Sequence, residues 1–512
     1  MAGRPAAGGN LTAMEIREVA VIGLGTMGAG IVEVFARAGL AVVAIDVDPG
    51  ALERGMATLD RSLGKAVARG KLTEQEKAAV LARVRPADRL GAAAAAGLVV
   101  EGVPERMEIK RQVFAELDQA CRPEAILATN TSSLSVTAIA AATRRPGRVA
   151  GLHFFNPAQV MRLVEVITTV RTAPATSQVL TELVRRLGKT PVQVADRAGF
   201  VANALLLPYL NHAVRLLETG YATREDIDAA ATAGIGLPMG PLALLDLIGL
   251  DTSLSVLEVL SGEFGGPRFA AAPMLRRLVE AGLTGRKAGR GFYDYETKER
   301  ARRPDSDTVL NDDRVAVPGP VTLVGAAAGP GMRLAEMIEA AGWPVAADPH
   351  GSGLVIVLAK KPGTDVLDAA LATGRPADAV GLHLAGDKLI ELIVTPMSAP
   401  GAVEAAAALA GSLGHTVVRC KDRPGFLAGA LLCPHLNDAV RMVQDGHASA
   451  ADIDAAMTLG CGYPRGPLQL LDQAGLGYVL TVLTQMYRRY GDPAFAPAPL
   501  LAEHAAAGLA FR

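Results

Sequence analysis

The chain contains 512 residues, of which 51 are basic and 52 acidic, so its formal net charge is −1. This balance gives no basic patch for nucleic acid or anionic lipid, and no apolar stretch approaches the ~18 residues that a membrane-spanning helix needs. The length predicts three or four domains, and the four cysteines, none in a CxxC pair, fit a reducing cytoplasm rather than a disulfide framework or a zinc site.

A nucleotide-binding pattern follows an N-terminal segment, residues 1–14, that we expect to be a disordered tail. A short apolar strand (18–23) leads into GLGTMG, a helix runs to about Ala38, and a second strand (41–45) stops at Asp46. This order predicts a Rossmann dinucleotide site with the pyrophosphate at the helix N-terminus. Asp46 suits a ribose 2′-hydroxyl but repels a 2′-phosphate, so we predict NAD rather than NADP. The expected cofactor contacts in the loop are Gly23, Gly25, Thr26, Met27 and Gly28.

Helices and strands continue to alternate after this motif. We expect a helical section over 51–84, a buried strand over 98–101, and a helix with Glu105 at its start and Lys110 one turn later. Another strand, 125–128, runs into NTSSL (130–134). Small polar residues at the carboxyl end of a parallel strand lie where α/β sheets place their ligands, although they equally suit the cap of the next helix.

The stretch GLHFFNPAQVMRLVEVI, residues 151–167, reads as two strands joined by a tight connection that contains Asn156-Pro157. If the strands pair about Gln159, His153 lies opposite Glu165. An imidazole that faces a carboxylate is suited to general base catalysis, because the anion fixes the tautomer and stabilises the imidazolium. Alone, the pair equally fits a structural histidine.

Long helices replace this alternation from Val192 onward. We expect a helix over 201–217 that Pro208 should kink, and a second helical section over 223–233 with Thr223 as its N-cap. A connection rich in glycine and proline (234–241) then leads to a further helix that starts within 242–250.

This helical part occurs twice. Residues 422–472 repeat residues 196–246 at a constant offset of 226, with 31 of 51 positions identical. Such self-similarity indicates an internal duplication. Between the copies lie a polar linker and a Rossmann-like segment with a strand at 321–324, a helix to about Ala341 and a strand at 345–347.

The second copy differs from the first at the positions that carry chemistry. Its glycine loop, 325–331, no longer fits the GxGxxG fingerprint. His383 and Glu391 echo the earlier pair, but their separation has shrunk from twelve residues to eight, so we expect His383 to lose its opposite-strand carboxylate. Gly429 replaces Asn203. We therefore expect no second working site.

The motifs GLGTMG, VVEGVPERMEIK, NTSSL, GLHFFNP, RLVEVI, DRAGFVANALL and GLPMGPLALLDLIGLD together resemble the L-3-hydroxyacyl-CoA dehydrogenase family. They cover about residues 15–295 in order. The resemblance implies NAD-dependent oxidation of an (S)-3-hydroxyacyl-CoA to the 3-ketoacyl-CoA. It implies an α/β fold in which a Rossmann domain and an all-α domain are followed by a degenerate Rossmann-like segment and a second helical copy.

The resemblance also implies roles for individual residues. His153 corresponds to the catalytic base and Glu165 to its partner, while Ser132 and Asn203 contact the substrate oxygens. Beyond the glycine loop and Asp46, the implied cofactor contacts are Glu105, Lys110, Asn130, Ser132, Asn156 and Lys287. The implied substrate contacts are Ser62, Arg69, Lys110, Ser132 and Asn203. Arg69 stands where the family has a lysine, which keeps the charge but changes the geometry.

The expected domain limits are 1–14 for the tail, 15–193 for the NAD-binding domain, 194–295 for the helical domain, 296–316 for the linker, 317–420 for the degenerate segment and 421–512 for the second helical copy. In the resembled family the helical domain is the dimer interface, so we expect the second copy to supply that surface within one chain. Whether the chain also forms homo-oligomers stays open.

The long layout resembles the phenylacetate-catabolism branch, which implies 3-hydroxyadipyl-CoA as substrate. A short-chain 3-hydroxybutyryl-CoA enzyme shares every motif. Two further alternatives are a free hydroxy-acid dehydrogenase of the 6-phosphogluconate type and a non-catalytic NAD-binding scaffold.

Overall fold

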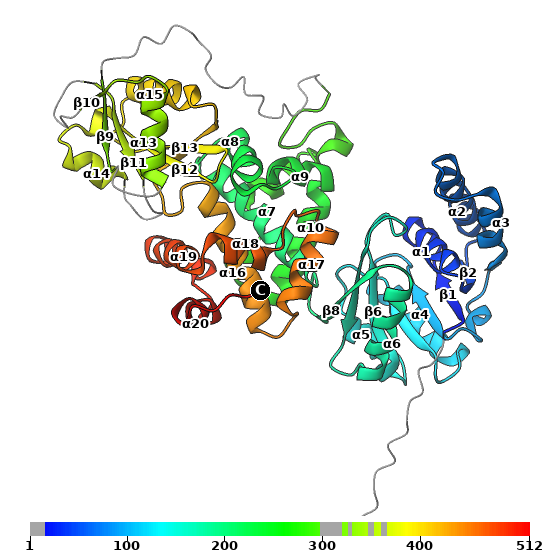
Figure 1. The fold of residues 1–512 in the computed structure, drawn as a ribbon. Coiled ribbons are helices and arrows are strands. Elements are labelled where there is room, and N and C mark those ends of the chain that lie inside the picture. The colour runs from blue at the N-terminus through cyan, green and yellow to red at the C-terminus, as the bar shows by residue number, and fades with distance from the viewer. Residues whose placement is uncertain (1–15, 297–319, 326–329, 347–352, 360–365) are drawn as a thin grey trace, which may run out of the picture. The chain divides into compact units, whose positions relative to one another are not determined.

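The computed structural model describes residues 16–296, 320–325, 330–346, 353–359 and 366–512. The chain forms two compact units (Figure 1). The first holds the N-terminal part up to Ala202 together with residues 446–461, and the second holds residues 203–445 and 462–512. The expected tail, most of the expected linker and positions 326–329 of the altered glycine loop lie outside the described residues.

The first unit is built on an eight-stranded sheet of order β3-β2-β1-β4-β5-β6-β7-β8. Neighbouring strands are parallel, except that β6 and β7 are antiparallel. The strands are β1 (Glu18–Ile22), β2 (Ala41–Ile45), β3 (Val84–Ala87), β4 (Leu98–Glu101), β5 (Ile126–Thr129), β6 (Val149–Phe154), β7 (Leu163–Thr168) and β8 (Thr190–Ala195). Most strands of this sheet are runs of apolar residues. Helices cover a parallel sheet on both faces, so successive side chains of a strand are buried on either side.

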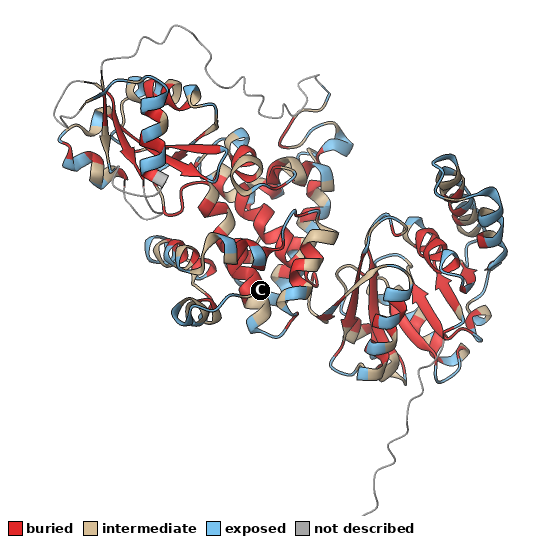
Figure 2. Ribbon diagram, in the orientation of Figure 1, coloured by how far each residue is buried: buried red, intermediate tan, exposed pale blue. Residues whose placement is uncertain are grey.

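Helices pack on this sheet and bury its residues, whose ribbon is red in Figure 2. They are α1 (Thr26–Arg37), α2 (Pro49–Ala68), α3 (Glu74–Ala82), α4 (Met107–Ala120), α5 (Val136–Ala140) and α6 (Pro174–Arg186). The predicted helical section 51–84 is therefore two helices and the start of a strand. It breaks because Gly70 takes a left-handed φ of 67° and Thr73 begins a new helix with a capping box to Glu76.

The second unit holds the remaining helices and a six-stranded sheet. The first helical copy comprises α7 (Ala202–Glu218), α8 (Arg224–Ala229), the π-helical segment η3 (Ala230–Ile235), α9 (Pro241–Ile248), α10 (Leu250–Phe264), α11 (Gly266–Phe269), α12 (Pro273–Glu280) and the short 3₁₀ turn η4 (Arg286–Ala288). Thr223 caps α8 as predicted, through a bond from the Asp226 N–H. Val192 lies in β8, so the change to long helices comes later than predicted.

The second sheet has the order β10-β9-β11-β12-β13-β14 and repeats the topology of the first, including one antiparallel pair. Its strands are β9 (Val321–Val324), β10 (Val345–Ala346), β11 (Val355–Leu358), β12 (Ala379–Ala385), β13 (Leu389–Val394) and β14 (Thr416–Lys421). The helices around it and of the second helical copy are α13 (Pro330–Ala340), α14 (Val366–Ala372), α15 (Pro400–Ser412), α16 (Ala428–Gln444), α18 (Pro467–Ala474), α19 (Leu476–Tyr490) and α20 (Pro499–Ala507). This layout confirms the predicted duplication.

The two copies exchange helices between their sheets. Helix α17 (Ala450–Gly460) belongs to the second helical copy by sequence, yet it packs on β7 and β8 of the first sheet. Its counterpart α8, with η3, packs on β14 and β13 of the second sheet. The residues before these helices repeat the exchange. His447 Nε2 bonds to the carbonyl oxygen of Phe200, and the hydroxyl of Tyr221, its counterpart at an offset of 226, donates to the carbonyl oxygen of Phe426.

Candidate active site

The loop between β1 and α1 has the shape that a bound pyrophosphate requires. A Cβ at Gly28 would lie 1.8 Å from the carbonyl oxygen of Gly23, so only glycine permits this approach of helix to strand. A Cβ at Gly25 would meet no protein atom within 4 Å, which leaves space beside the helix N-terminus. No side chain caps α1, so its first N–H groups are available to an anion. These residues fit the phosphates of a dinucleotide.

Asp46 lies directly after β2 and is tied to the same loop. Its Oδ2 accepts a hydrogen bond from the Leu24 N–H (2.8 Å), and its Oδ1 accepts one from the Asp48 N–H (3.1 Å). A carboxylate has about four acceptor sites, so Asp46 retains capacity for ribose hydroxyls. Its position at the end of the second strand fits the adenosine ribose of NAD.

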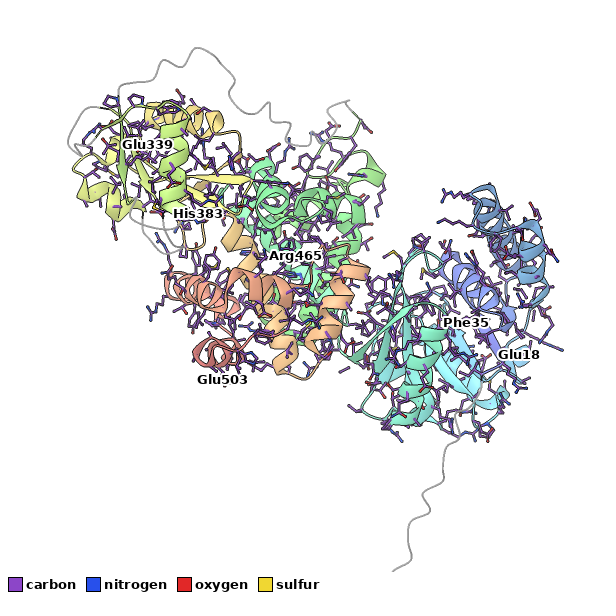
Figure 3. The ribbon with its side chains drawn as sticks, viewed as in Figure 1. Glu18, Phe35, Glu339, His383, Arg465 and Glu503 are labelled. Atoms are coloured by element: carbon purple, nitrogen blue, oxygen red, sulfur yellow. The ribbon has the colours of Figure 1, made fainter. Side chains whose placement is uncertain are left out.

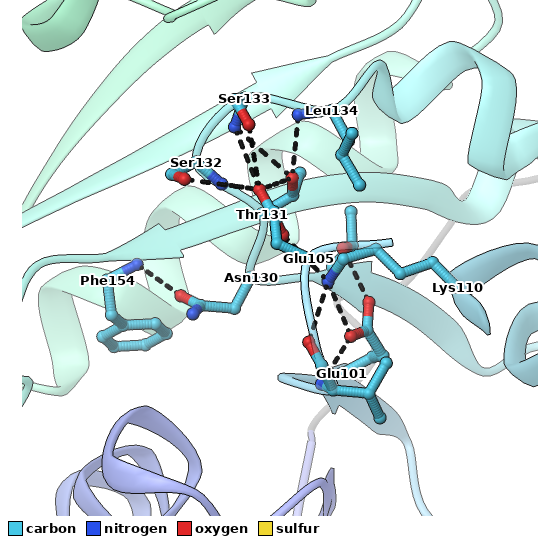
Figure 4. A network of polar contacts seen from close by, with 11 residues as sticks. Glu101, Glu105, Lys110, Asn130, Thr131, Ser132, Ser133, Leu134 and Phe154 are labelled. Atoms are coloured by element: carbon cyan, nitrogen blue, oxygen red, sulfur yellow. Dashed lines mark hydrogen bonds and ion pairs between the residues drawn. The ribbon is translucent and has the colours of Figure 1, made fainter. Parts of the chain in front are cut away.

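A buried network joins the ends of β4 and β5 (Figure 4). Lys110 on α4 is fully buried, with its Nζ 2.8 Å from Glu101 Oε1 and 3.4 Å from Glu105 Oε2. The Thr129 hydroxyl donates to the other oxygen of Glu101 (2.7 Å). Lys110 was predicted to contact cofactor and substrate. In this structure its ammonium group faces the two glutamates, so it acts by holding Glu105 in place.

Glu105 in turn organises the loop after β5. Its Oε1 accepts hydrogen bonds from the Thr131 hydroxyl (2.6 Å) and from the backbone N–H groups of Ser132 (2.9 Å) and Ser133 (3.2 Å). Burial opposes ionisation of Glu105, but the Thr131 hydrogen bond and the charge of Lys110 outweigh it, so its pKa lies below the usual value. An ionised Glu105 therefore fixes the position of Ser132.

Asn130 lies beside this loop and connects it to the next strand. Its side-chain oxygen accepts a hydrogen bond from the Phe154 N–H (2.8 Å), as Figure 4 shows. Since that oxygen is engaged, the side-chain NH₂ is the group that Asn130 can offer to a ligand.

The predicted pairing of His153 with Glu165 is confirmed. The two residues are direct partners across the antiparallel strands β6 and β7, and His153 Nδ1 lies 2.7 Å from Glu165 Oε2. A carboxylate only accepts hydrogen bonds, so Nδ1 carries the proton and Nε2 is left as the basic atom. The imidazole is 8% exposed and Glu165 is 1% exposed, a setting in which a charge-assisted hydrogen bond is strong.

Glu165 also holds the chain where it enters the helical part. Its second oxygen, Oε1, accepts hydrogen bonds from the N–H groups of Val201 (3.2 Å) and Ala202 (3.4 Å). The preceding residue, Phe200, has a positive φ of 46° and places its ring 5.8 Å from the His153 ring, centroid to centroid. One carboxylate thus orients the imidazole and anchors this turn.

The other predicted residues lie as follows. Ser62, on α2, accepts a hydrogen bond from Gln159 Nε2 (3.2 Å), which links α2 to the connection between β6 and β7. Arg69 is exposed at the end of α2, and Asn156 is exposed in that connection. Asn203 and Lys287 belong to the second unit, where Asn203 lies in the first turn of α7 and Lys287 pairs with Asp251 (2.6 Å).

Sequence reasoning missed three residues that shape the site: Glu101, Thr131 and Asp196. Asp196 accepts hydrogen bonds from the backbone N–H groups of Val136 (3.0 Å) and Thr137 (2.6 Å) at the start of α5. An acid that ends an apolar strand with a lysine nine residues later, as in Glu101 and Lys110, was an available signal for the buried pair.

The second copy retains the same pair, and here the sequence prediction is wrong. His383 and Glu391 are direct partners across β12 and β13, with His383 Nδ1 2.7 Å from Glu391 Oε2; His383 is labelled in Figure 3. Which residues face each other in a hairpin depends on where the turn is centred, and not on how many residues separate them in the sequence. The four missing residues shorten the connection and leave the pairing intact.

The second copy has nevertheless lost the space that Asn203 would need. A Cβ at Gly429, the counterpart of Asn203, would lie 2.8 Å from the hydroxyl oxygen of Tyr478. Glu391 otherwise behaves like Glu165, because its Oε1 accepts hydrogen bonds from the N–H groups of Leu427 (2.8 Å) and Ala428 (2.7 Å). The pair is kept while a neighbouring polar residue is not.

Within the part of the chain that the structure describes, no group of His, Cys, Asp or Glu side chains could hold a metal ion. Across the same described ranges, no helix has both the length and the hydropathy for a bilayer crossing.

Comparisons with known proteins agree with this geometry. The family model described as "3-hydroxyacyl-CoA dehydrogenase, NAD binding domain" matches residues 18–197, and its C-terminal domain model matches residues 199–295 and again 425–511. The 3-hydroxyadipyl-CoA dehydrogenase of Escherichia coli is 36% identical over 96% of this chain and 98% of its own. A probable 3-hydroxybutyryl-CoA dehydrogenase of Bacillus subtilis is 46% identical over 56% of this chain and 99% of its own. The crystal structure of a 3-hydroxybutyryl-CoA dehydrogenase from Escherichia coli superposes with a TM-score of 0.82 at 35% identity, covering 96% of this chain and 99% of the other.

Substitution of Glu165 and of its counterpart Glu391 separates a contribution to stability from a contribution to turnover. We expect Glu165→Gln and Glu391→Gln each to lower the free energy of unfolding by about 1–3 kcal/mol, because each places an amide where a buried carboxylate accepts three hydrogen bonds. Only Glu165→Gln should also lower turnover, by about 10²-fold or more. Calorimetric unfolding and NADH formation measure the two effects. Equal turnover losses in both variants would contradict the distinction.

Proposed function

The chain belongs to the 3-hydroxyacyl-CoA dehydrogenase family, and we propose that His153 is the general base of its NAD-dependent oxidation of a 3-hydroxyacyl-CoA. The observation that supports this role is the buried hydrogen bond between His153 Nδ1 and Glu165 Oε2 at 2.7 Å in the copy that keeps the GxGxxG loop. It leaves Nε2 to take the hydroxyl proton of the substrate. Glu165 is the positioning residue, because it orients the ring and stabilises the imidazolium that forms.

The proposed cofactor contacts are the glycine loop, Asp46, Glu105, Asn130, Ser132, Asn156 and Lys287. NAD, when bound, accepts the hydride from C3 of the substrate. The fit of NAD rather than NADP is supported by Asp46, whose negative charge opposes a 2′-phosphate. Glu105, held by Lys110, keeps the hydroxyl residues after β5 in one arrangement. That preorganisation lowers the cost of orienting the reactants.

The proposed substrate contacts differ in the support that they have. Ser132 is proposed to donate a hydrogen bond to the substrate oxygen. Its backbone N–H (2.9 Å) and its hydroxyl (3.3 Å) both donate to Glu105 Oε1, so the hydroxyl turns away from Glu105 when it donates to the substrate. Asn203 is proposed for the same oxygens on the strength of its place in the family motif. Ser62 and Arg69 are proposed to contact CoA, and both lie on or just after α2. Lys110 is also proposed to contact cofactor and substrate, and its buried ammonium group pairs with Glu101 and Glu105.

Substitution of the imidazole tests the proposed base. We expect His153→Gln to bind NADH with unchanged affinity and to lose about 10²–10⁴ in kcat, because general base catalysis is worth that much. The matched control is His383→Gln, which alters the equivalent pair in the second copy and should keep wild-type turnover. NADH titration by fluorescence and steady-state kinetics measure both. Wild-type kcat in His153→Gln would remove the role assigned to this residue.

The proposed substrate is 3-hydroxyadipyl-CoA, an assignment that is supported by the match of the whole chain to the Escherichia coli enzyme of that name. 3-Hydroxybutyryl-CoA is the alternative, since the shorter relative and the superposed crystal structure carry that name. A free hydroxy-acid dehydrogenase and a non-catalytic scaffold are disfavoured by membership of the family and by the intact histidine–carboxylate pair. We accordingly propose that the protein acts in phenylacetate catabolism.

A comparison of two substrates tests this assignment. We expect kcat/KM for 3-hydroxyadipyl-CoA to exceed that for 3-hydroxybutyryl-CoA by at least about tenfold, because a site built for a polar group rejects the analogue that lacks it. Purified full-length protein and an NADH readout suffice. A preference for the four-carbon substrate would overturn the assignment and favour the alternative.

The second copy is proposed to supply, within one chain, the helical surface that a partner subunit supplies in the shorter family members. This proposal is supported by α17, which packs on β7 and β8 beside Glu165, and by His447, which bonds to Phe200 next to the catalytic pair. A reducing cytoplasm is the proposed location, since four cysteines occur and none forms a disulfide among the described residues.

Truncation after residue 295 tests the role of the second copy. The fragment lacks α17, so we expect it to expose apolar surface and to dimerise or aggregate. Size-exclusion chromatography with light scattering, together with turnover measurements, follows both properties. A soluble, monomeric fragment with full activity would refute the proposal.

A further inference from the structure

A cavity of about 360 Å³ lies within the second unit, between α7 and the chain around the end of α19. This volume falls within the range of small-molecule sites. None of the residues assigned above to catalysis, cofactor or substrate lines it. Its existence and chemistry are independent of the proposed function.

The lining of the cavity combines an apolar wall with excess positive charge. Leu216, Met486 and Phe495 are among the buried apolar residues. Four basic residues, Arg215, Arg268, Lys421 and Arg423, also line it, whereas Asp492 is the single acidic residue in the lining. This lining suits a ligand with an apolar body and a negative head.

The internal duplication shows that the cavity follows from a change in sequence. At the offset of 226, Ala494 corresponds to Arg268 and His212 to Asp438. At the position that the duplication relates to Ala494, the side chain of Arg268 is buried. It pairs with Asp438, with 2.7 Å between Arg268 Nε and Asp438 Oδ2. On the cavity side, alanine replaces that long side chain and leaves its volume open.

The same two positions lose both members of the buried ion pair on the cavity side. His212 stands where the other copy has an aspartate, and its Nε2 bonds to the carbonyl oxygen of Ala430 (3.0 Å). Burial and the nearby charge of Arg268 lower the pKa of His212 to about 3, so it is neutral at physiological pH. The cavity side therefore lacks both the arginine and the aspartate of the other copy, and the charge of its lining comes from other residues.

Two observations locate the unused positive charge. Arg215 Nη2 donates to the carbonyl oxygens of Pro267 (2.7 Å) and Ala270 (2.6 Å), but its buried Nε has no acceptor in the part of the chain that the structure describes. Lys421 and Arg423 also line the cavity, and neither forms an ion pair among the described residues. Buried donors without acceptors are rare and costly, so Arg215 adds incompletely satisfied positive charge beside the cavity.

We propose that this cavity is a second ligand site, which binds a small organic carboxylate with an unbranched or aromatic apolar body. The carboxylate accepts hydrogen bonds from the side chains of Arg423 and Lys421, while the apolar body fills the volume beside Ala494. A guanidinium fork matches the two oxygens of a carboxylate. A singly charged head suits this mostly apolar site better than a phosphate, because each charge taken from water needs its own partners.

Calorimetric titration of the full-length protein with hexanoate tests the proposal. We expect saturable binding with a Kd of about 1 mM or tighter, given the size of the probe. Acetate lacks the apolar body and 1-hexanol lacks the charge, so each should bind at least about tenfold more weakly. Hexyl phosphate has the same apolar body and a phosphate head group, so it tests whether the site prefers a carboxylate or a phosphate. Absence of saturable hexanoate binding, or equal binding of 1-hexanol, or tighter binding of hexyl phosphate, overturns the proposal.

Three variants assign the binding to this cavity. Lys421→Gln/Arg423→Gln removes charge and keeps the volume, whereas Ala494→Leu fills the volume and keeps the charge. Both should weaken hexanoate at least about tenfold, with turnover unchanged. The matched control, Lys388→Gln/Arg488→Gln, removes two exposed charges outside the lining and should bind normally. If Ala494→Leu fails to fold, the charge variant carries the test. Unchanged binding in the charge variant places hexanoate elsewhere and refutes the site.

Discussion

The buried carboxylate of Glu165 is the point on which the arrangement of the site depends. One oxygen binds the imidazole of His153, and the other accepts the N–H groups of Val201 and Ala202. Three donors converge on a group that is 1% exposed, and a buried acceptor of this kind is costly to leave unsatisfied. The same contacts that hold the chain as it enters the helical part therefore also set the tautomer and orientation of the base. The fold and the proposed catalytic role thus depend on one residue.

The second copy separates these two roles. Glu391 binds His383 and the N–H groups of Leu427 and Ala428 in the same way, although Tyr478 leaves no room for the counterpart of Asn203. The pair in the second copy therefore makes the same structural contribution without the counterpart of Asn203. By this reasoning the histidine–carboxylate pair alone does not identify a working site. The GxGxxG loop and the network around Glu105 distinguish the first copy.

Much of this architecture could be predicted from the sequence because local signals specified it. The GxGxxG loop, the Thr223 cap, the pairing of His153 with Glu165 and the repeat at an offset of 226 all follow from spacing and residue type. Long-range packing was not readable. Lys110 is predicted to contact cofactor and substrate, and the structure pairs its ammonium group with Glu101 on a neighbouring strand. The exchange of α8 and α17, and the cavity beside Ala494, depend on which surfaces meet, and no local pattern records that.

The exchange of α8 and α17 bears on the order in which the protein can mature on the ribosome. The first sheet is translated early, but the helix that covers β7 and β8 is encoded some way past the second sheet. At about 5–20 residues per second, the roughly 240 intervening residues take on the order of 10–50 s to synthesise. Throughout that interval the edge of the first sheet is uncovered. The nascent chain must therefore keep an incomplete domain from aggregating until its last structural element emerges.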